Sequence, residues 1–174
     1  MISRERHDLV LAIHLQSHGF AYVLFEGWPA LVDWGVYDAR GAHKNARCLD
    51  RIDALLALHT PDLLVLQDMS KTGTHRARRI RELNDEAAEL ADQCGVLVRA
   101  YSRAQVVDYF KELGAVTKHM IAETIARYIP ALHLYVPPAR KPWMSENARM
   151  GIFEAAALAL VFFQRERGLE LEGS

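Results

Sequence analysis

The sequence lacks the motifs that would assign a zinc-binding, secreted or membrane protein directly. Only two cysteines, Cys48 and Cys94, occur in 174 residues, and the eight histidines form no HExxH or Cys/His pattern typical of zinc. Isolated cysteines are typical of reduced thiols, so we expect a cytoplasmic protein. The longest apolar run, residues 155–163, is much shorter than the about 18 residues of a membrane span. The polar start MISRERHD also predicts neither a signal peptide nor a membrane partner.

An excess of charge of one sign is lacking too. The formal net charge is −1, so no overall basic field indicates nucleic-acid binding. One local exception is the basic stretch KTGTHRARRIR at residues 71–81. Its cations oppose the dipole of the helix that they begin, which favours a bound anion. We interpret it as a phosphate-contacting patch, with a solvated helix face as the alternative. The candidate residues are Lys71, Arg76, Arg78 and Arg79.

The hydrophobic pattern predicts strands first and helices later. Three early apolar segments joined by short turns favour an antiparallel meander, and each later strand follows a helix, which favours parallel pairing. We expect strands at residues 9–15, 20–25, 30–37, 62–67 and 96–101. We expect helices at residues 44–59, 77–94, 102–113, 117–128 and 145–167, with Ser102, Thr117 and Ser145 as N-caps and Gly168 as the last stop.

This order of elements is that of a ribonuclease H-like α/β fold. It has a mixed five-stranded sheet, with three antiparallel strands followed by two parallel ones, and helices flank the sheet. In that plan the first strand lies centrally and pairs with the fourth. We expect a single domain at residues 1–168 and a disordered tail at residues 169–174.

Four segments, taken in order, resemble the RuvC family of Holliday-junction resolvases. They are AIHLQSHGFAY at residues 12–22, PDLLVLQ at 61–67, the segment 106–118 with its Gly114 and Thr117-Lys118, and FEAAALAL at 153–160. The resemblance implies DNA, including branched DNA, as the partner and a homodimer as the working form. It also implies phosphodiester hydrolysis by a pair of Mg²⁺ or Mn²⁺ ions held by carboxylates.

The sequence departs from that family at two informative positions. His14 stands where the family has an aspartate in its first strand, and Gln67 stands where it has a glutamate in its fourth. Imidazole is a poor Mg²⁺ ligand, and an amide oxygen carries no charge. The resemblance implies a catalytic set of His14, Gln67, Glu154 and Lys118, with Lys111 as a second basic residue for DNA.

Glu154 and Asp68 are the remaining candidates for metal ligands. Asp68 follows Gln67 directly, so it should point to the opposite face of the sheet unless the strand has a bulge. Glu154 lies in an apolar helix segment, so the alternative to a site role is an ion pair with Arg149 or Lys118. His14 is either a ligand that favours Mn²⁺ or Zn²⁺ or a neutral residue that fills a former catalytic position.

Three functions follow from these residues. The first is a RuvC-like DNA-binding protein with lost or weakened nuclease activity. The second is an active structure-specific endonuclease that uses a rearranged metal site. The third is an interaction protein that kept only the fold and needs no metal. Trp28, Trp34 and Trp143 are scattered, so we expect them in the core or in an interface rather than on a base-stacking surface.

Overall fold

A five-stranded sheet organises the chain in the order β3-β2-β1-β4-β5. The computed structural model describes residues 8–70 and 76–172. β1 pairs antiparallel with β2 and parallel with β4, β2 pairs antiparallel with β3, and β4 pairs parallel with β5. This arrangement confirms the predicted ribonuclease H-like sheet. The strands are β1 (Leu9–Gln16), β2 (Gly19–Glu26), β3 (Leu31–Asp38), β4 (Leu63–Gln67) and β5 (Leu97–Tyr101).

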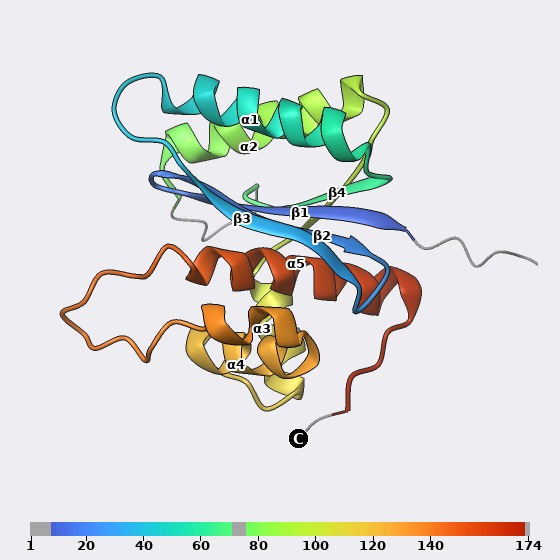
Figure 1. Ribbon diagram of the computed structural model, residues 1–174, viewed down its shortest axis with the longest axis vertical. Coiled ribbons are helices and arrows are strands. Elements are labelled where there is room, and N and C mark those ends of the chain that lie inside the picture. The colour runs from blue at the N-terminus through green and yellow to red at the C-terminus, as the bar shows by residue number, and fades with distance from the viewer. Residues whose placement is uncertain (1–7, 71–75, 173–174) are drawn as a thin grey trace, which may run out of the picture.

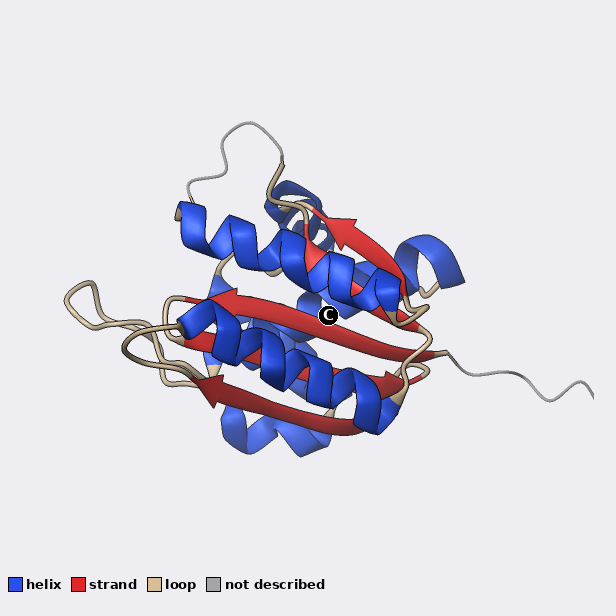
Figure 2. Cartoon of the chain, turned by 90° about the horizontal axis from the view of Figure 1, so that it is seen from above, coloured by secondary structure: helices blue, strands red, loops and turns tan. Residues whose placement is uncertain are grey.

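Helices cover both faces of the sheet (Figures 1 and 2). On one face lie α1 (Lys44–His59) and α2 (Arg78–Gln93). On the other face α5 (Met150–Arg167) packs directly on β1 and β2. The outer layer over α5 holds α3 (Arg103–Glu112), α4 (Lys118–Tyr128) and the 3-10 helix η1 (Pro130–Tyr135). Because α5 is covered on both sides, nearly every residue in its first half is apolar and buried.

The central strand divides its side chains between two cores. Val10 and Ala12 face the α5 layer, whereas Leu11 and Ile13 face α1 and α2. By this alternation His14 lies on the α5 face of the sheet. The strand therefore presents an imidazole to the helix that carries Glu154.

α5 begins later than its sequence pattern predicts. We expected the helix to start at Ser145, but it starts at Met150. The Asn147 side chain accepts a hydrogen bond from the Arg149 backbone N–H at 2.9 Å. This turn competes with helix formation and keeps residues 145–149 in the loop before the helix.

The other predicted helix ends are confirmed. Ser102 caps α3 with a capping box, Thr117 caps α4, and Gly168 ends α5 in a left-handed conformation. In the segment after α5, the Tyr128 hydroxyl donates to the Glu172 carbonyl at 2.8 Å, and Leu169 packs against the core. None of the helices in the described parts of the chain has the length and apolar character to cross a bilayer.

Candidate functional site

A cavity of about 510 Å³ opens where the end of β1 meets the start of α5. We call it the phosphate cavity, because three cations and two carboxylates among its lining residues leave an excess of positive charge. Most of its charged lining comes from segments far apart in the sequence, which the fold brings together. The lining includes His14, Gln16, Ser17, His18, Arg40, Arg76, Lys118, Glu146 and Glu154.

Glu154 is held by two cations from the outer helix layer. Its Oε2 accepts a hydrogen bond from Arg103 Nη1 at 2.9 Å, and its Oε1 lies 3.5 Å from Lys118 Nζ. The Glu154 side chain is only 12% exposed, so these ion pairs satisfy a buried charge on an apolar helix. Arg103 and Lys118 are the first residues of α3 and α4, directly after the caps Ser102 and Thr117.

A second carboxylate shares Lys118. Glu146 Oε1 lies 2.7 Å from Lys118 Nζ, so one ammonium bridges Glu146 and Glu154. On an unbroken helix from Ser145, Glu146 would stand about 12 Å along the axis from Glu154. Because α5 begins only at Met150, the loop brings Glu146 back to the cavity instead. Burial raises the pKa of Glu146, but the hydrogen bond and charge of Lys118 outweigh it and lower that pKa below its ordinary value.

His14 is a neutral residue at the base of the phosphate cavity. Burial lowers its pKa to about 4, and the positive charges of Arg76, Lys118 and Arg103 add to this effect. Glu154 acts in the opposite direction but does not compensate. The imidazole therefore carries no charge at neutral pH and adds none to the cavity.

Arg76 supplies a cation from the segment that precedes α2. Its guanidinium Nη2 donates to the carbonyl of Leu15, and its Nε has no hydrogen-bond partner among the described residues. Burial lowers the pKa of Arg76, while Glu154 and Glu146 oppose that shift. An arginine keeps its proton at any physiological pH. Arg76 therefore contributes a fixed positive charge to the lining of the cavity.

Gln67 and Asp68 do not line the phosphate cavity as the structure describes it. The register that pairs Ala12 with Val65, continued by two residues, sets Gln67 beside His14 on the same face of the sheet. The carboxylate of Asp68 accepts from the backbone N–H and the hydroxyl of Ser70, at 3.0 and 2.6 Å. The structure therefore brings together His14, Glu154 and Lys118, with Gln67 on the neighbouring strand.

Of the predicted basic patch, Arg76 lines the cavity and the other described members do not. Arg79 binds Asn45 and the carbonyl of Ser17, which ties α2 to α1 and to the β1–β2 turn. Arg78 forms an exposed pair with Glu82 on its own helix. Lys111 is exposed in the last turn of α3, and Lys71 lies outside the described residues.

Arg103 was not among the predicted site residues, and Glu146, which falls within the predicted helix 145–167, lies in the loop before α5. A signal for Arg103 was present, because Ser102-Arg103 and Thr117-Lys118 both place a cation directly after a helix cap. The acid that the two cations share, Glu154, depends on how the helices pack and is seen only in the structure. Glu146 could be found only from the loop that folds it back.

The carboxylates of this site do not fit a pair of divalent cations. Within residues 8–70 and 76–172, no group of three or more His, Cys, Asp and Glu side chains is arranged to hold a metal ion. Both oxygens of Glu154 face cations of the chain itself. Arg103 and Lys118 thus neutralise the acids that a metal pair would require.

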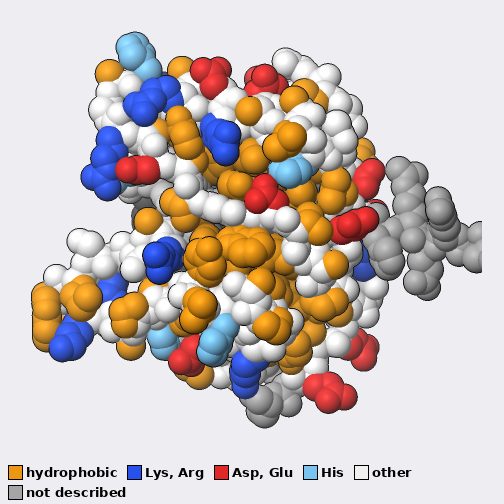
Figure 3. Space-filling view, viewed as in Figure 1, with side chains coloured by type: hydrophobic (Ala, Val, Ile, Leu, Met, Phe, Trp, Pro, Cys, Tyr) orange, Lys and Arg blue, Asp and Glu red, His pale blue; other side chains and the backbone are white. Residues whose placement is uncertain are grey.

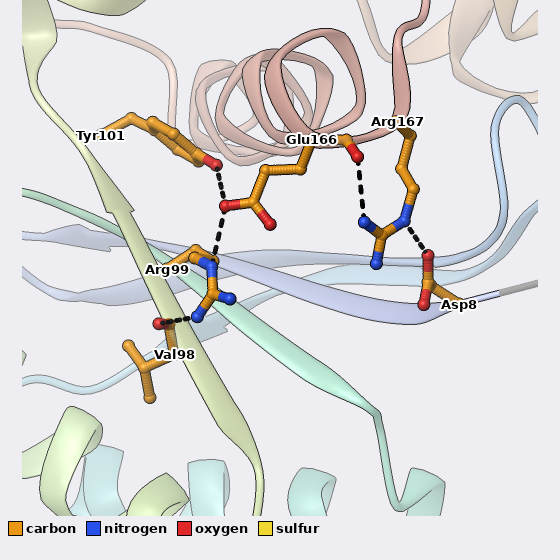
Figure 4. A network of polar contacts seen from close by, with 6 residues as sticks. All are labelled: Asp8, Val98, Arg99, Tyr101, Glu166 and Arg167. Atoms are coloured by element: carbon orange, nitrogen blue, oxygen red, sulfur yellow. Dashed lines mark hydrogen bonds and ion pairs between the residues drawn. The ribbon is translucent and has the colours of Figure 1, made fainter.

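The opposite end of α5 is fixed by a separate polar network (Figure 4). Glu166 Oε1 accepts from Arg99 Nε at 2.8 Å and from the Tyr101 hydroxyl at 3.4 Å, and Arg167 pairs with Asp8. These contacts anchor the helix to β5 and to the residue before β1. This network fixes the helix that carries Glu154, and none of its residues lines the phosphate cavity.

The sheet order and the helices on its two faces are those of a ribonuclease H-like fold. No protein-family model and no curated protein sequence matches the chain. Among solved structures, RuvC of T. thermophilus in complex with Holliday junction substrate is similar, with a TM-score of 0.68, 17% identity and coverage of 93% of this chain and 97% of that chain.

Two further structures agree with this result. A Thermus thermophilus RuvC structure has a TM-score of 0.60 at 20% identity, covering 90% of this chain and 95% of its own. The yeast mitochondrial Holliday junction resolvase Ydc2 has a TM-score of 0.59 at 12% identity, covering 91% and 78%. The chain therefore has the fold of RuvC-type resolvases over most of its length.

Proposed function

We propose that this protein is a RuvC-like DNA-binding protein of the Holliday-junction resolvase lineage in which metal-dependent nuclease activity is lost or weakened. The observation that carries the proposal is the clasp of Glu154 by Arg103 and Lys118. Because Arg103 and Lys118 neutralise the Glu154 carboxylate, its oxygens are not available to hold a metal ion. The fold similarity to a RuvC solved with a Holliday junction supports branched DNA as the ligand.

The charges of the phosphate cavity favour an anion. Arg40, Arg76 and Lys118 face it together with Glu146 and Glu154, while Arg103 adds its charge from behind Glu154. Arg40 is itself paired with Asp38 at 3.1 Å, and His14 is neutral at physiological pH, so the four cations exceed the three acids by one charge. The fold similarity to a RuvC solved with Holliday junction substrate favours a DNA phosphate as this anion. Cationic side chains can bind a phosphate without Mg²⁺.

A labelled four-way DNA junction tests the proposal directly. We expect salt-sensitive binding that is equally strong in EDTA and in Mg²⁺, with little or no cleavage in Mg²⁺ or Mn²⁺. Lys118→Gln should weaken binding more than about tenfold, because it removes one cation and leaves two acids facing the phosphate. Gel-shift titration measures the affinity, and a denaturing gel measures cleavage.

Arg165→Gln is the control, because Arg165 is an exposed cation in the last turn of α5 and lies outside the lining of the cavity. It should bind the junction as the wild type does. Efficient cutting in Mg²⁺ would overturn the proposal in favour of an active endonuclease with a rearranged site. Absence of binding at about 50 mM salt would leave an interaction protein that shares only the fold.

A further inference from the structure

A second cavity, of about 540 Å³, adjoins the phosphate cavity. We call it the loop cavity, because it lies under residues 136–149, the loop between η1 and α5. The two cavities share Lys118 and Glu146, so the ion pair between these residues forms their common wall. A ligand held in the first cavity therefore stands directly beside the second.

The loop cavity is lined differently from its neighbour. Pro137, Pro138, Met144 and Met150 give it apolar walls, and Arg140 lies among them as a cation. Methionine side chains are polarizable and adapt to flat rings. This combination suits an aromatic ring that is attached to a negatively charged backbone.

The 136–149 loop projects from the body of the molecule (Figure 1), and hydrophobic and basic side chains gather on it (Figure 3). Trp143 is 77% exposed, and Lys141 Nζ lies 5.4 Å from the centre of its ring. We expected Trp143 in the core or in an interface, but within the chain it has no such cover. Trp143 therefore lies outside the core of this chain, and an exposed ring with one cation beside it has the chemistry on which a base can stack.

We infer that the loop cavity receives one unpaired nucleobase of the DNA strand whose phosphate lies in the phosphate cavity. This inference rests on the proposed function and adds the chemical class of a second subsite. Three observations support it: the shared wall at Lys118 and Glu146, the apolar lining, and the positive charges of Arg140 and Lys141 on the loop. Base pairing hides a base from such a cavity, so only an unpaired or extruded base can enter.

Three DNA probes separate the base from its phosphate. One is a duplex with a single bulged adenine, the second carries an abasic nucleotide at the bulge, and the third is a perfect duplex. We expect the adenine bulge to bind about tenfold more tightly than the abasic bulge, since stacking of one base contributes on this scale. Fluorescence anisotropy of the labelled DNA measures the three affinities.

Ala139→Phe tests the location of the base. Ala139 is an exposed loop residue that lines the cavity, so an added ring should fill it without disturbing the core. The variant should bind the adenine and abasic bulges equally while keeping its affinity for the abasic probe. Leu134→Phe is the matched control, because Leu134 is 88% exposed and lies outside the cavity lining.

Each outcome decides a different claim. Equal, salt-sensitive binding of both bulges by the wild type would overturn the base subsite and leave the proposed function standing. Failure to bind any of the three probes, or the four-way junction, would overturn the proposed function and the subsite with it. A preference for adenine that survives Ala139→Phe would place the base elsewhere. Loss of self-association in Ala139→Phe, measured by light scattering without DNA, would assign the loop cavity to a second copy of the chain instead.

Discussion

Lys118 both neutralises two acids and lines the phosphate cavity. Its ammonium contacts Glu146 and Glu154 and also faces the open phosphate cavity. The sequence could identify Lys118 and Glu154, because both fall in segments that resemble the RuvC family. It could not identify Arg103 as the main partner of Glu154, because that contact depends on how α3 packs over α5.

His14 should make the stability of the protein depend on pH. Its pKa in the fold is about 4, below the ordinary value of 6.5, so the unfolded chain binds more protons between these values. The contribution is therefore complete above pH 6.5 and is lost as the pH falls towards 4. We expect unfolding to become easier by up to about 2 kcal/mol between about pH 7.5 and about pH 5.

Urea unfolding at both pH values measures this loss, and His14→Gln supplies the comparison. Glutamine cannot titrate, so the variant should lose less stability on acidification by about the same 2 kcal/mol. A wild type and a variant with identical pH dependence would show that His14 is not buried as a neutral imidazole. Glu146, whose pKa is lowered, adds a loss of stability in the same direction, but at more acidic pH.

At the level of elements, α5 packs closely against the sheet at Gly151. A Cβ atom there would lie 2.0 Å from Gln16 Nε2 and 2.8 Å from the Cβ of Ala21. The Gln16 amide occupies this space because it donates to the carbonyl of Ala148 at 3.0 Å. The close approach also leaves no room for an acid one turn before Glu154, so this helix face offers Glu154 alone.

Gly151→Ala should destabilise the protein by about 1–3 kcal/mol, although alanine favours helices, because overpacking outweighs helix propensity. Chemical denaturation measures the change. The double variant Gln16→Ala/Gly151→Ala should recover part of the loss, since it removes the nearer clash and keeps the contact with Ala21. No loss in the single variant would contradict the close packing of α5 on β1.

Sequence periodicity predicted most elements because local patterns define them. The alternation in β1, the caps Ser102 and Thr117, and the stop at Gly168 are all short-range signals. The predicted start of α5 was wrong because the hydrophobic pattern does not reveal the turn at Asn147, which competes with helix formation. That error mattered for function, since it moved Glu146 from the helix to the wall of both cavities.

For the whole molecule, the net charge of −1 gives DNA no long-range attraction, so binding depends on a few gathered cations. Three of them, Arg40, Arg76 and Lys118, line the phosphate cavity. If each contacts one phosphate, the logarithm of the junction affinity should fall with the logarithm of salt concentration with a slope of about −3. This is a shallow dependence compared with that of proteins with an extended basic surface.

Arg76→Gln should reduce the size of that slope by about 1, because one phosphate contact is lost. Arg165→Gln is the control, since Arg165 is an exposed arginine near the far end of α5 and should leave the slope unchanged. Anisotropy titrations over about 50 to 200 mM NaCl give both slopes. If Arg165→Gln lowered the slope as much as Arg76→Gln, the charge of the surface as a whole would drive binding. A cavity formed by β1, α4 and α5 would then not be the place where the phosphate is held.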